Sequence, residues 1–167
     1  LEGQQLDRVF QVLPGASLTL VDVTVTGGAA DIGGGIYNQQ GTLAVERSAI
    51  AANVAEYGGG IYDLEGVVTI TDSIFDQNLA QGGLGSDGQG GAIFASSSLV
   101  RVERTELTGN TAAGGANGRG MGGAIYSEFA TWGAFDASTV AGNRALGGAG
   151  NDGDFGACLG TGTLVCN

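Results

Sequence analysis

Short stretches in which hydrophobic and polar residues alternate run along most of this chain. Four of them read SLTLVDVTV (17–25), GTLAVERSAI (41–50), GVVTITDSIF (66–75) and SLVRVERTEL (98–107). A period of two, many β-branched residues and flanking glycines are typical of half-buried β-strands. No segment carries the 3.6-residue apolar period of an amphipathic helix, so the pattern predicts an all-β protein.

A longer pattern repeats around these stretches. GGGIY at 33–37 returns at 58–62, and near-copies follow at 90–94 and 122–126. Its isoleucines are therefore 25, 32 and 32 residues apart. Two polar columns keep nearly the same step: the asparagines Asn53, Asn78, Asn110 and Asn143, and, five residues before each, Ser48, Ser73, Thr105 and Ser138. Strands that repeat at such a period are typical of a solenoid whose repeats stack on one another.

The two patterns together predict a parallel β-solenoid that forms a single domain over residues 1–167, with about five coils of 25–33 residues. We expect an opening strand over 1–17, repeated coils over 18–157 and a partial coil over 158–167. Coils three to five are longer because one corner expands into glycine-rich loops. The inward hydrophobic columns are expected to be Leu18, Leu43, Val68 and Val100; Leu20, Val45, Ile70, Val102 and Phe135; Val25, Ile50, Phe75, Leu107 and Val140; and Ile36, Ile61, Ile93 and Ile125.

Polar side chains recur in the same register. The asparagine column is predicted to form an amide ladder in a turn, with contact to a ligand as the alternative. The serine and threonine column is also expected to be structural. A third column alternates in sign, which predicts ion pairs between coils, with Arg47 between two carboxylates: Asp22, Arg47, Asp72 and Arg104.

An aromatic column directly follows the inward isoleucines and should therefore point outward: Tyr37, Tyr62, Phe94 and Tyr126. Three interpretations remain open for it. The rings stack on one another, they form an interface with another protein, or they bind carbohydrate.

Charge and composition exclude several classes of function. The formal net charge is −11, the chain has no histidine, and all six of its cationic side chains are arginines. Such a surface repels nucleic acid and anionic lipid, and no segment is long and apolar enough to insert in a membrane. The lack of histidine disfavours zinc sites and Ser-His-Asp or Cys-His catalysis.

Two cysteines, Cys158 and Cys166, lie eight residues apart near the end of the sequence. An even number in a small acidic domain predicts one disulfide and an oxidising compartment, outside the cell or on its surface. Two small buried hydrophobic residues are the alternative.

Two segments, GGLGSD (82–87) and GGAGND (147–152), match the start of the calcium-binding repeat of β-rolls. The copies are 65 residues apart, whereas β-roll calcium sites need adjacent copies. We therefore expect no cofactor, with weaker calcium coordination as the alternative at three carboxylates: Asp87, Asp152 and Asp154.

Catalysis would need a pair of carboxylates on adjacent coils, and Glu103 and Asp136 are the candidates. A lyase would also need a strong base beside the substrate, and no residue fits that role. We predict no catalytic residues and no enzymatic activity, with a polysaccharide lyase or glycosidase as the alternative.

The repeat itself is similar to known ones. TLAVERSAIAANVAEYGGGIYD (42–63), with its serine, Asn-x-Ala and GGGIY, resembles the right-handed β-helix repeats of bacterial surface proteins, including the choice-of-anchor and polymorphic outer-membrane protein families. LDRVFQVLPGASLTLVDVTVTGG (6–28) resembles the first segment of such domains. The resemblance covers nearly the whole chain and implies a right-handed, single-stranded parallel β-helix in a secreted or surface protein. It implies no shared catalytic motif.

These observations predict a non-enzymatic, extracellular structural or adhesive β-solenoid. A solenoid exposes strand edges at both ends, so we expect head-to-tail self-association into a filament. The alternatives are a β-helix that binds or processes carbohydrate, with a polysaccharide or cell-surface partner, and a calcium-binding surface module.

Overall fold

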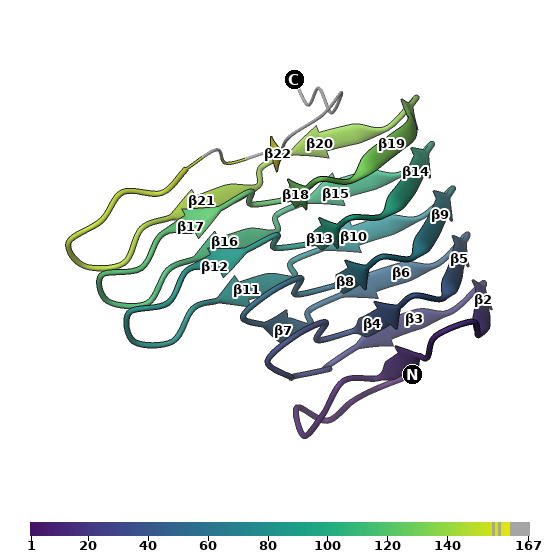
Figure 1. Ribbon diagram of the computed structural model, residues 1–167, viewed down its shortest axis with the longest axis horizontal. Coiled ribbons are helices and arrows are strands. Elements are labelled where there is room, and N and C mark those ends of the chain that lie inside the picture. The colour runs from purple at the N-terminus through teal and green to yellow at the C-terminus, as the bar shows by residue number, and fades with distance from the viewer. Residues whose placement is uncertain (155, 157, 161–167) are drawn as a thin grey trace.

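The computed structural model describes residues 1–154, 156 and 158–160 (Figure 1). This part of the chain forms 22 strands and no helix, and all strand pairs are parallel. The all-β prediction is confirmed. Since the described residues include no helix, none of them forms a helical span across a membrane.

The strands belong to five parallel sheets, which we number in the order in which the chain passes through them. Sheet 1 contains β1 (Phe10–Val12), β4 (Ile36–Gln39), β8 (Ile61–Leu64), β13 (Ile93–Ser96), β18 (Ile125–Glu128) and β22 (Cys158–Gly160). Sheet 2 contains β2 (Ser17–Val21), β5 (Thr42–Glu46), β9 (Val67–Thr71), β14 (Leu99–Glu103) and β19 (Thr131–Asp136). Sheet 3 contains β3 (Thr24–Thr26), β6 (Ala49–Ala51), β10 (Ile74–Asp76), β15 (Glu106–Thr108) and β20 (Thr139–Ala141). Sheet 4 contains β7 (Val54–Ala55), β11 (Leu79–Gln81), β16 (Thr111–Ala113) and β21 (Arg144–Leu146), and sheet 5 contains β12 (Gly88–Gln89) and β17 (Gly120–Met121).

Each strand pairs with the equivalent strand of the next repeat, and like residues face one another. Ile36 pairs with Ile61, and Ile93 pairs with both Ile61 and Ile125. In sheet 3, Phe75 pairs with Ile50 on one side and Leu107 on the other. The register predicted from the repeat is therefore the register of the sheets.

The predicted inward columns form the core. Ile36, Ile50, Ile61 and Phe75 are all 0% exposed, and they belong to one cluster of buried hydrophobic side chains. At the last strands the same columns are only partly buried, as Phe135 and Val140 show. Burial of these side chains stabilises the stack because each one removes apolar surface of its neighbours from water.

The glycines of the repeated phrase have two separate roles. The first glycine of each phrase has a positive φ, 59° at Gly33 and 63° at Gly58, which turns the corner before the strand at no steric cost. The second glycine lies against backbone: a Cβ on Gly59 would be 2.5 Å from the carbonyl oxygens of both Leu79 and Gly91. The two consecutive glycines are therefore required for two different physical reasons.

The longer repeats extend as loops on one side of the molecule, beyond sheets 4 and 5 (Figure 1). The loops stack by backbone hydrogen bonds, for example from Gly85 N to Ala116 O (2.9 Å) and from Asn117 N to Ala149 O (3.0 Å). Gly88 of β12 lies against backbone of two repeats, since a Cβ there would clash with the carbonyl oxygens of Ala80 in the same repeat and Ala113 in the next. The glycine content therefore allows close packing of backbone on backbone.

Candidate functional site

The asparagine column is a continuous amide ladder at the turn between sheets 3 and 4. Asn53 donates from Nδ2 to Asn78 Oδ1 (3.0 Å), Asn78 to Asn110 Oδ1 (3.0 Å) and Asn110 to Asn143 Oδ1 (3.0 Å). Asn53, Asn78 and Asn110 are 0% exposed. The amides of Asn53, Asn78 and Asn110 donate to the next repeat, and that of Asn143 donates to Leu107 O of the preceding one (2.8 Å), so the ladder connects the repeats.

The hydroxyl column does the same at the turn between sheets 2 and 3. Ser73 Oγ accepts a hydrogen bond from Ser48 N (3.2 Å) and donates to Thr71 O (2.7 Å). The same pattern holds for the other members of the column: Ser48, Thr105 and Ser138. Each hydroxyl satisfies backbone groups that the turn would otherwise leave unpaired.

The aromatic column lies on the face opposite the isoleucines, as predicted, but its rings are not fully exposed. Tyr37 and Phe94 are only 8% and 4% exposed, and Tyr62 and Tyr126 are partly buried. The rings cover one another: Tyr62 stacks on Phe94 with centroids 4.7 Å apart and planes at 8°, and Phe94 lies 5.2 Å from Tyr126. The spacing of parallel strands brings ring faces together, which favours self-stacking over sugar binding.

At the Tyr126 end of the column, the ring is partly shielded from water. Burial, followed by the hydrogen bond from Tyr126 Oη to Glu128 Oε1 (3.0 Å), raises the pKa of Tyr126 to about 12. Arg8 lies 5.3 Å from the Tyr37 ring centroid at the other end. These contacts hold the rings in place.

The calcium candidates do not meet in one oxygen-lined site. Arg119 N donates to Asp87 Oδ1 (2.6 Å), and its guanidinium lies 3.6 Å from Asp87 Oδ2 and 3.4 Å from Asp154 Oδ2. A cationic side chain thus bridges two of the candidates, and Asp152 is exposed on the loop. Within the described residues no three Asp, Glu, His or Cys side chains gather as a metal site would require.

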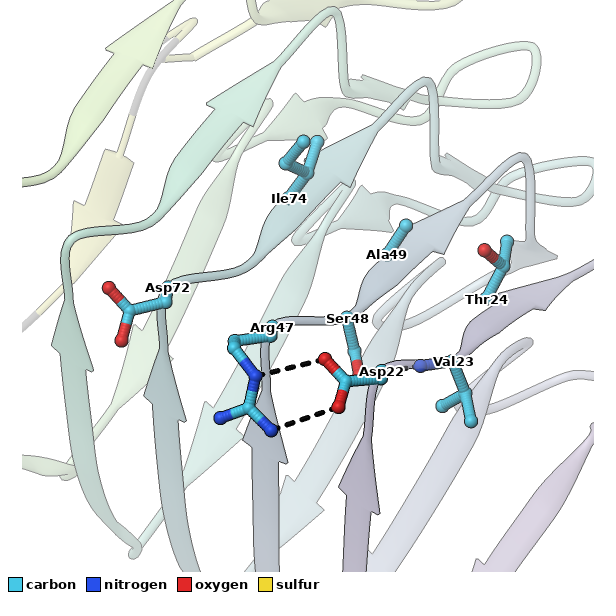
Figure 2. Close-up of a pocket in the computed structure, with 8 residues that line it drawn as sticks. All are labelled: Asp22, Val23, Thr24, Arg47, Ser48, Ala49, Asp72 and Ile74. Atoms are coloured by element: carbon cyan, nitrogen blue, oxygen red, sulfur yellow. Dashed lines mark hydrogen bonds and ion pairs between the residues drawn. The ribbon is translucent and has the colours of Figure 1, made fainter.

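Three members of the charged column, Asp22, Arg47 and Asp72, line an open groove at the corner between sheets 2 and 3 (Figure 2). Arg47 forms two 2.9 Å hydrogen bonds to Asp22, and Arg104 forms a similar pair with Asp72 (2.7 and 2.8 Å). These hydrogen bonds lower the pKa of both carboxyl groups. The predicted pairing between repeats is present, but on the adjacent repeats Arg47 bonds to Asp22 and not to Asp72, and its other ion pair is with its sequence neighbour Glu46 (3.8 Å).

The candidate catalytic pair lies on adjacent strands, since Glu103 pairs with Asp136 in register. Glu103 is occupied by two arginines: Arg101 Nε donates to Glu103 Oε1 (2.6 Å), and Arg104 Nη1 lies 3.4 Å from Oε2. Both carboxylate oxygens of Glu103 are therefore engaged by arginine side chains.

Sequence reasoning missed one buried polar pair, Asn38 and Asp63. Both are 0% exposed, and Asn38 donates from Nδ2 to Asp63 Oδ1 (2.6 Å). The signal was available, because each lies two residues after an inward isoleucine and strand alternation therefore places it inward too.

Strand edges are left open at both ends of the described stack. β2 is the first strand of sheet 2 and β19 is its last, and no other described strand pairs with their outer edges. The edge of β3 is covered, because Thr26 N donates to Leu1 O (3.0 Å) and Gly3 N to Thr26 O (2.9 Å). The open edge of β2 therefore exposes unpaired backbone groups.

Cys158 lies in register with Ile125 in sheet 1. Cys166 lies outside the described residues, so the Cys158–Cys166 disulfide stays a prediction.

Comparison with known proteins leaves the geometry as the only guide to function: no protein-family model, no curated protein and no solved structure matches this chain.

Proposed function

We propose that this chain is a right-handed, single-stranded parallel β-helix of about five coils that serves as a structural or adhesive module outside the cell. The chain returns to sheets 1, 2 and 3 in the same order in every repeat, with strands of sheets 4 and 5 added in later repeats, which supports the helical path. Connections between parallel strands of one sheet are right-handed in about 98% of cases, which supports the hand. The resemblance of the repeat to bacterial surface proteins supports the location.

One observation carries the structural role. A binding or catalytic protein would use polar columns of this kind to contact ligands. Here these columns form hydrogen bonds from one repeat to the next. The asparagine ladder alone links Asn53 to Asn143 without interruption. A stack connected in this way along its axis is suited to bearing load or acting as a spacer.

Self-association is the most specific form of this proposed function. All strands run parallel, so the open edge of β2 in one copy can pair with the open edge of β19 in another in the register that the sheets already use. Such a contact uses two different surfaces and does not close, so it propagates head to tail. The net charge of −11 disfavours sideways clumping of the resulting filament.

Thr19→Pro tests this pairing. In a parallel ladder the N–H and C=O groups of one residue face the same neighbouring strand. Those of the next residue face the opposite side. Ala16 O accepts from Thr42 N (2.9 Å) and Asp22 N donates to Glu46 O (3.2 Å), so residues 18 and 20 face β5 and the Thr19 N–H points to the open edge. Thr19 is exposed, and proline is tolerated on an edge strand whose N–H faces solvent.

The expected result is a folded protein that no longer assembles. Light scattering of the wild type and of Thr19→Ala should show mass that grows with concentration, and electron micrographs should show linear particles. Thr19→Pro should stay monomeric with an unchanged circular dichroism spectrum. A wild type that is monomeric at every concentration, or equal assembly by all three proteins, would contradict head-to-tail pairing.

A further inference from the structure

Asp63 is a buried acid whose surroundings are neutral. It is 0% exposed and lies in an inward column of sheet 1 between Asn38 of β4 and Ala95 of β13. Asp63 Oδ2 has no hydrogen-bond partner. Burying an ionised carboxylate without a compensating partner is strongly unfavourable, so this oxygen calls for an explanation.

The preceding repeat shows what the position requires. Asn38 Nδ2 donates to Gly41 O (3.1 Å), three residues further along the chain, as well as to Asp63 Oδ1. Gly41 O also accepts from Val67 N (2.9 Å), so both lone pairs of that carbonyl are used. The side chain at this position therefore supplies a donor to the carbonyl of the following turn.

The next repeat has the same backbone but a different side chain. Asp63 is in register with Asn38, and Gly66 follows Asp63 by three residues, as Gly41 follows Asn38. Gly66 O accepts from Leu99 N (3.0 Å), the equivalent of the bond to Gly41 O. Asp63 Oδ1 accepts from Asn38, which leaves Oδ2 in the place of the Asn38 Nδ2 donor. An ionised Oδ2 would place two hydrogen-bond acceptors, Oδ2 and Gly66 O, against each other there. A protonated Oδ2 supplies the missing donor.

We propose that Asp63 is held in the folded protein as a neutral carboxylic acid that donates from Oδ2 to Gly66 O, and that it acts as a pH-sensitive clamp between adjacent repeats. The proton takes the place of one amide hydrogen of an asparagine. The clamp is complete in acid and is lost when Asp63 ionises. This inference concerns the stability of the stack and does not depend on head-to-tail assembly.

The electrostatics of the position agree with this assignment. Burial raises the pKa of Asp63 to about 6, and the nearby Ser98 hydroxyl and Asn38 amide oppose the shift only in part. The side chains that face Asp63 are Asn38 from β4, Ala95 from β13 and Ser98 from the turn before β14, and none of them titrates. No charged side chain of the described residues contributes to the shift.

The sign of the pH dependence follows. The pKa of Asp63 is about 6 in the folded state and 3.8, its ordinary value, in the unfolded chain. Between these pH values the folded state binds more protons than the unfolded state. The contribution of Asp63 to the free energy of unfolding is therefore complete below about pH 4 and falls as the pH rises through 6. A difference of about two pKa units corresponds to about 100-fold in the unfolding equilibrium constant.

Asp63→Asn replaces the proton by a permanent donor and is the direct test. Urea unfolding at pH 8 should show the variant more stable than the wild type by up to about 100-fold in the unfolding constant, and the two should agree at pH 4. Asp31→Asn removes the same charge at an exposed position and should give no such pH-dependent gain. The infrared band of a protonated carboxyl group, present in the folded wild type at pH 5, should be absent from Asp63→Asn.

Three results would overturn the proposal. They are an Asp63→Asn variant no more stable than the wild type at pH 8, a gain of equal size at pH 4 and pH 8, and no infrared band that depends on Asp63. Stabilisation of the wild type by sodium or calcium at pH 8, abolished in Asp63→Asn, would also overturn it, because a bound cation would then neutralise the carboxylate.

Discussion

Replacing Asn78 by alanine is expected to lower the free energy of unfolding by about 4 kcal/mol, because each buried group left without a partner costs about 1–3 kcal/mol. Asn78 Oδ1 accepts from Asn53 N (3.2 Å) and from Asn53 Nδ2 (3.0 Å), and its own amide donates to Ile50 O (2.8 Å). Alanine removes all of these bonds at a site that is 0% exposed. Urea denaturation followed by circular dichroism measures the loss.

Asn143→Ala is the matched control for this prediction. Asn143 also accepts from Asn110 N (2.9 Å) and from Asn110 Nδ2 (3.0 Å), but it is only partly buried at the last strands of the described stack. Water can replace part of its hydrogen bonding, so we expect a loss of about 1–2 kcal/mol. Equal losses for the two variants would show that burial within the stack does not give the ladder its strength.

Gly59→Ala is expected to lower the free energy of unfolding by about 3 kcal/mol, because an overpacked backbone contact must be relieved by movement of whole strands. The added Cβ would lie 2.5 Å from Leu79 O and 2.5 Å from Gly91 O, and neither atom belongs to a flexible side chain. The thermal midpoint and the urea midpoint should both fall.

Gly83→Ala provides the comparison at an unconstrained glycine. Nothing lies within 4 Å of a Cβ built on Gly83, which is in one of the exposed loops. The change should be within about 0.5 kcal/mol of zero, as for most surface substitutions. A Gly59→Ala variant as stable as Gly83→Ala would refute the close backbone contact at the second glycine of the phrase.

The stacked core was predictable because its columns repeat in the sequence. Ile36 and Ile61 stack because a shift of one residue would turn every inward side chain of the strand outward. The amide ladder through Asn78 follows from the same spacing. The repeating phrase itself is explained by two separate constraints, a positive φ at its first glycine and a backbone contact at its second.

The outer face was harder to predict. Alternation correctly placed Tyr37 and Phe94 opposite the isoleucines, but it could not show that neighbouring rings would cover them. In the loops, Asp87 and Asp154 were candidates for weak calcium coordination, yet only the fold shows Arg119 between them. Sequence spacing gives no information on which segments fold over a face.

By itself, the sequence determined the all-β class, the parallel register and the inward columns, because a repeated period requires equivalent residues to meet in adjacent strands. Three outcomes came from the tertiary structure alone: Tyr37 is buried, Arg47 bonds to Asp22 rather than to Asp72, and Asp63 Oδ2 has no hydrogen-bond partner. These outcomes depend on contacts of individual atoms within the stack. A period specifies which residues are neighbours, but the packing around them specifies which of their polar atoms find partners.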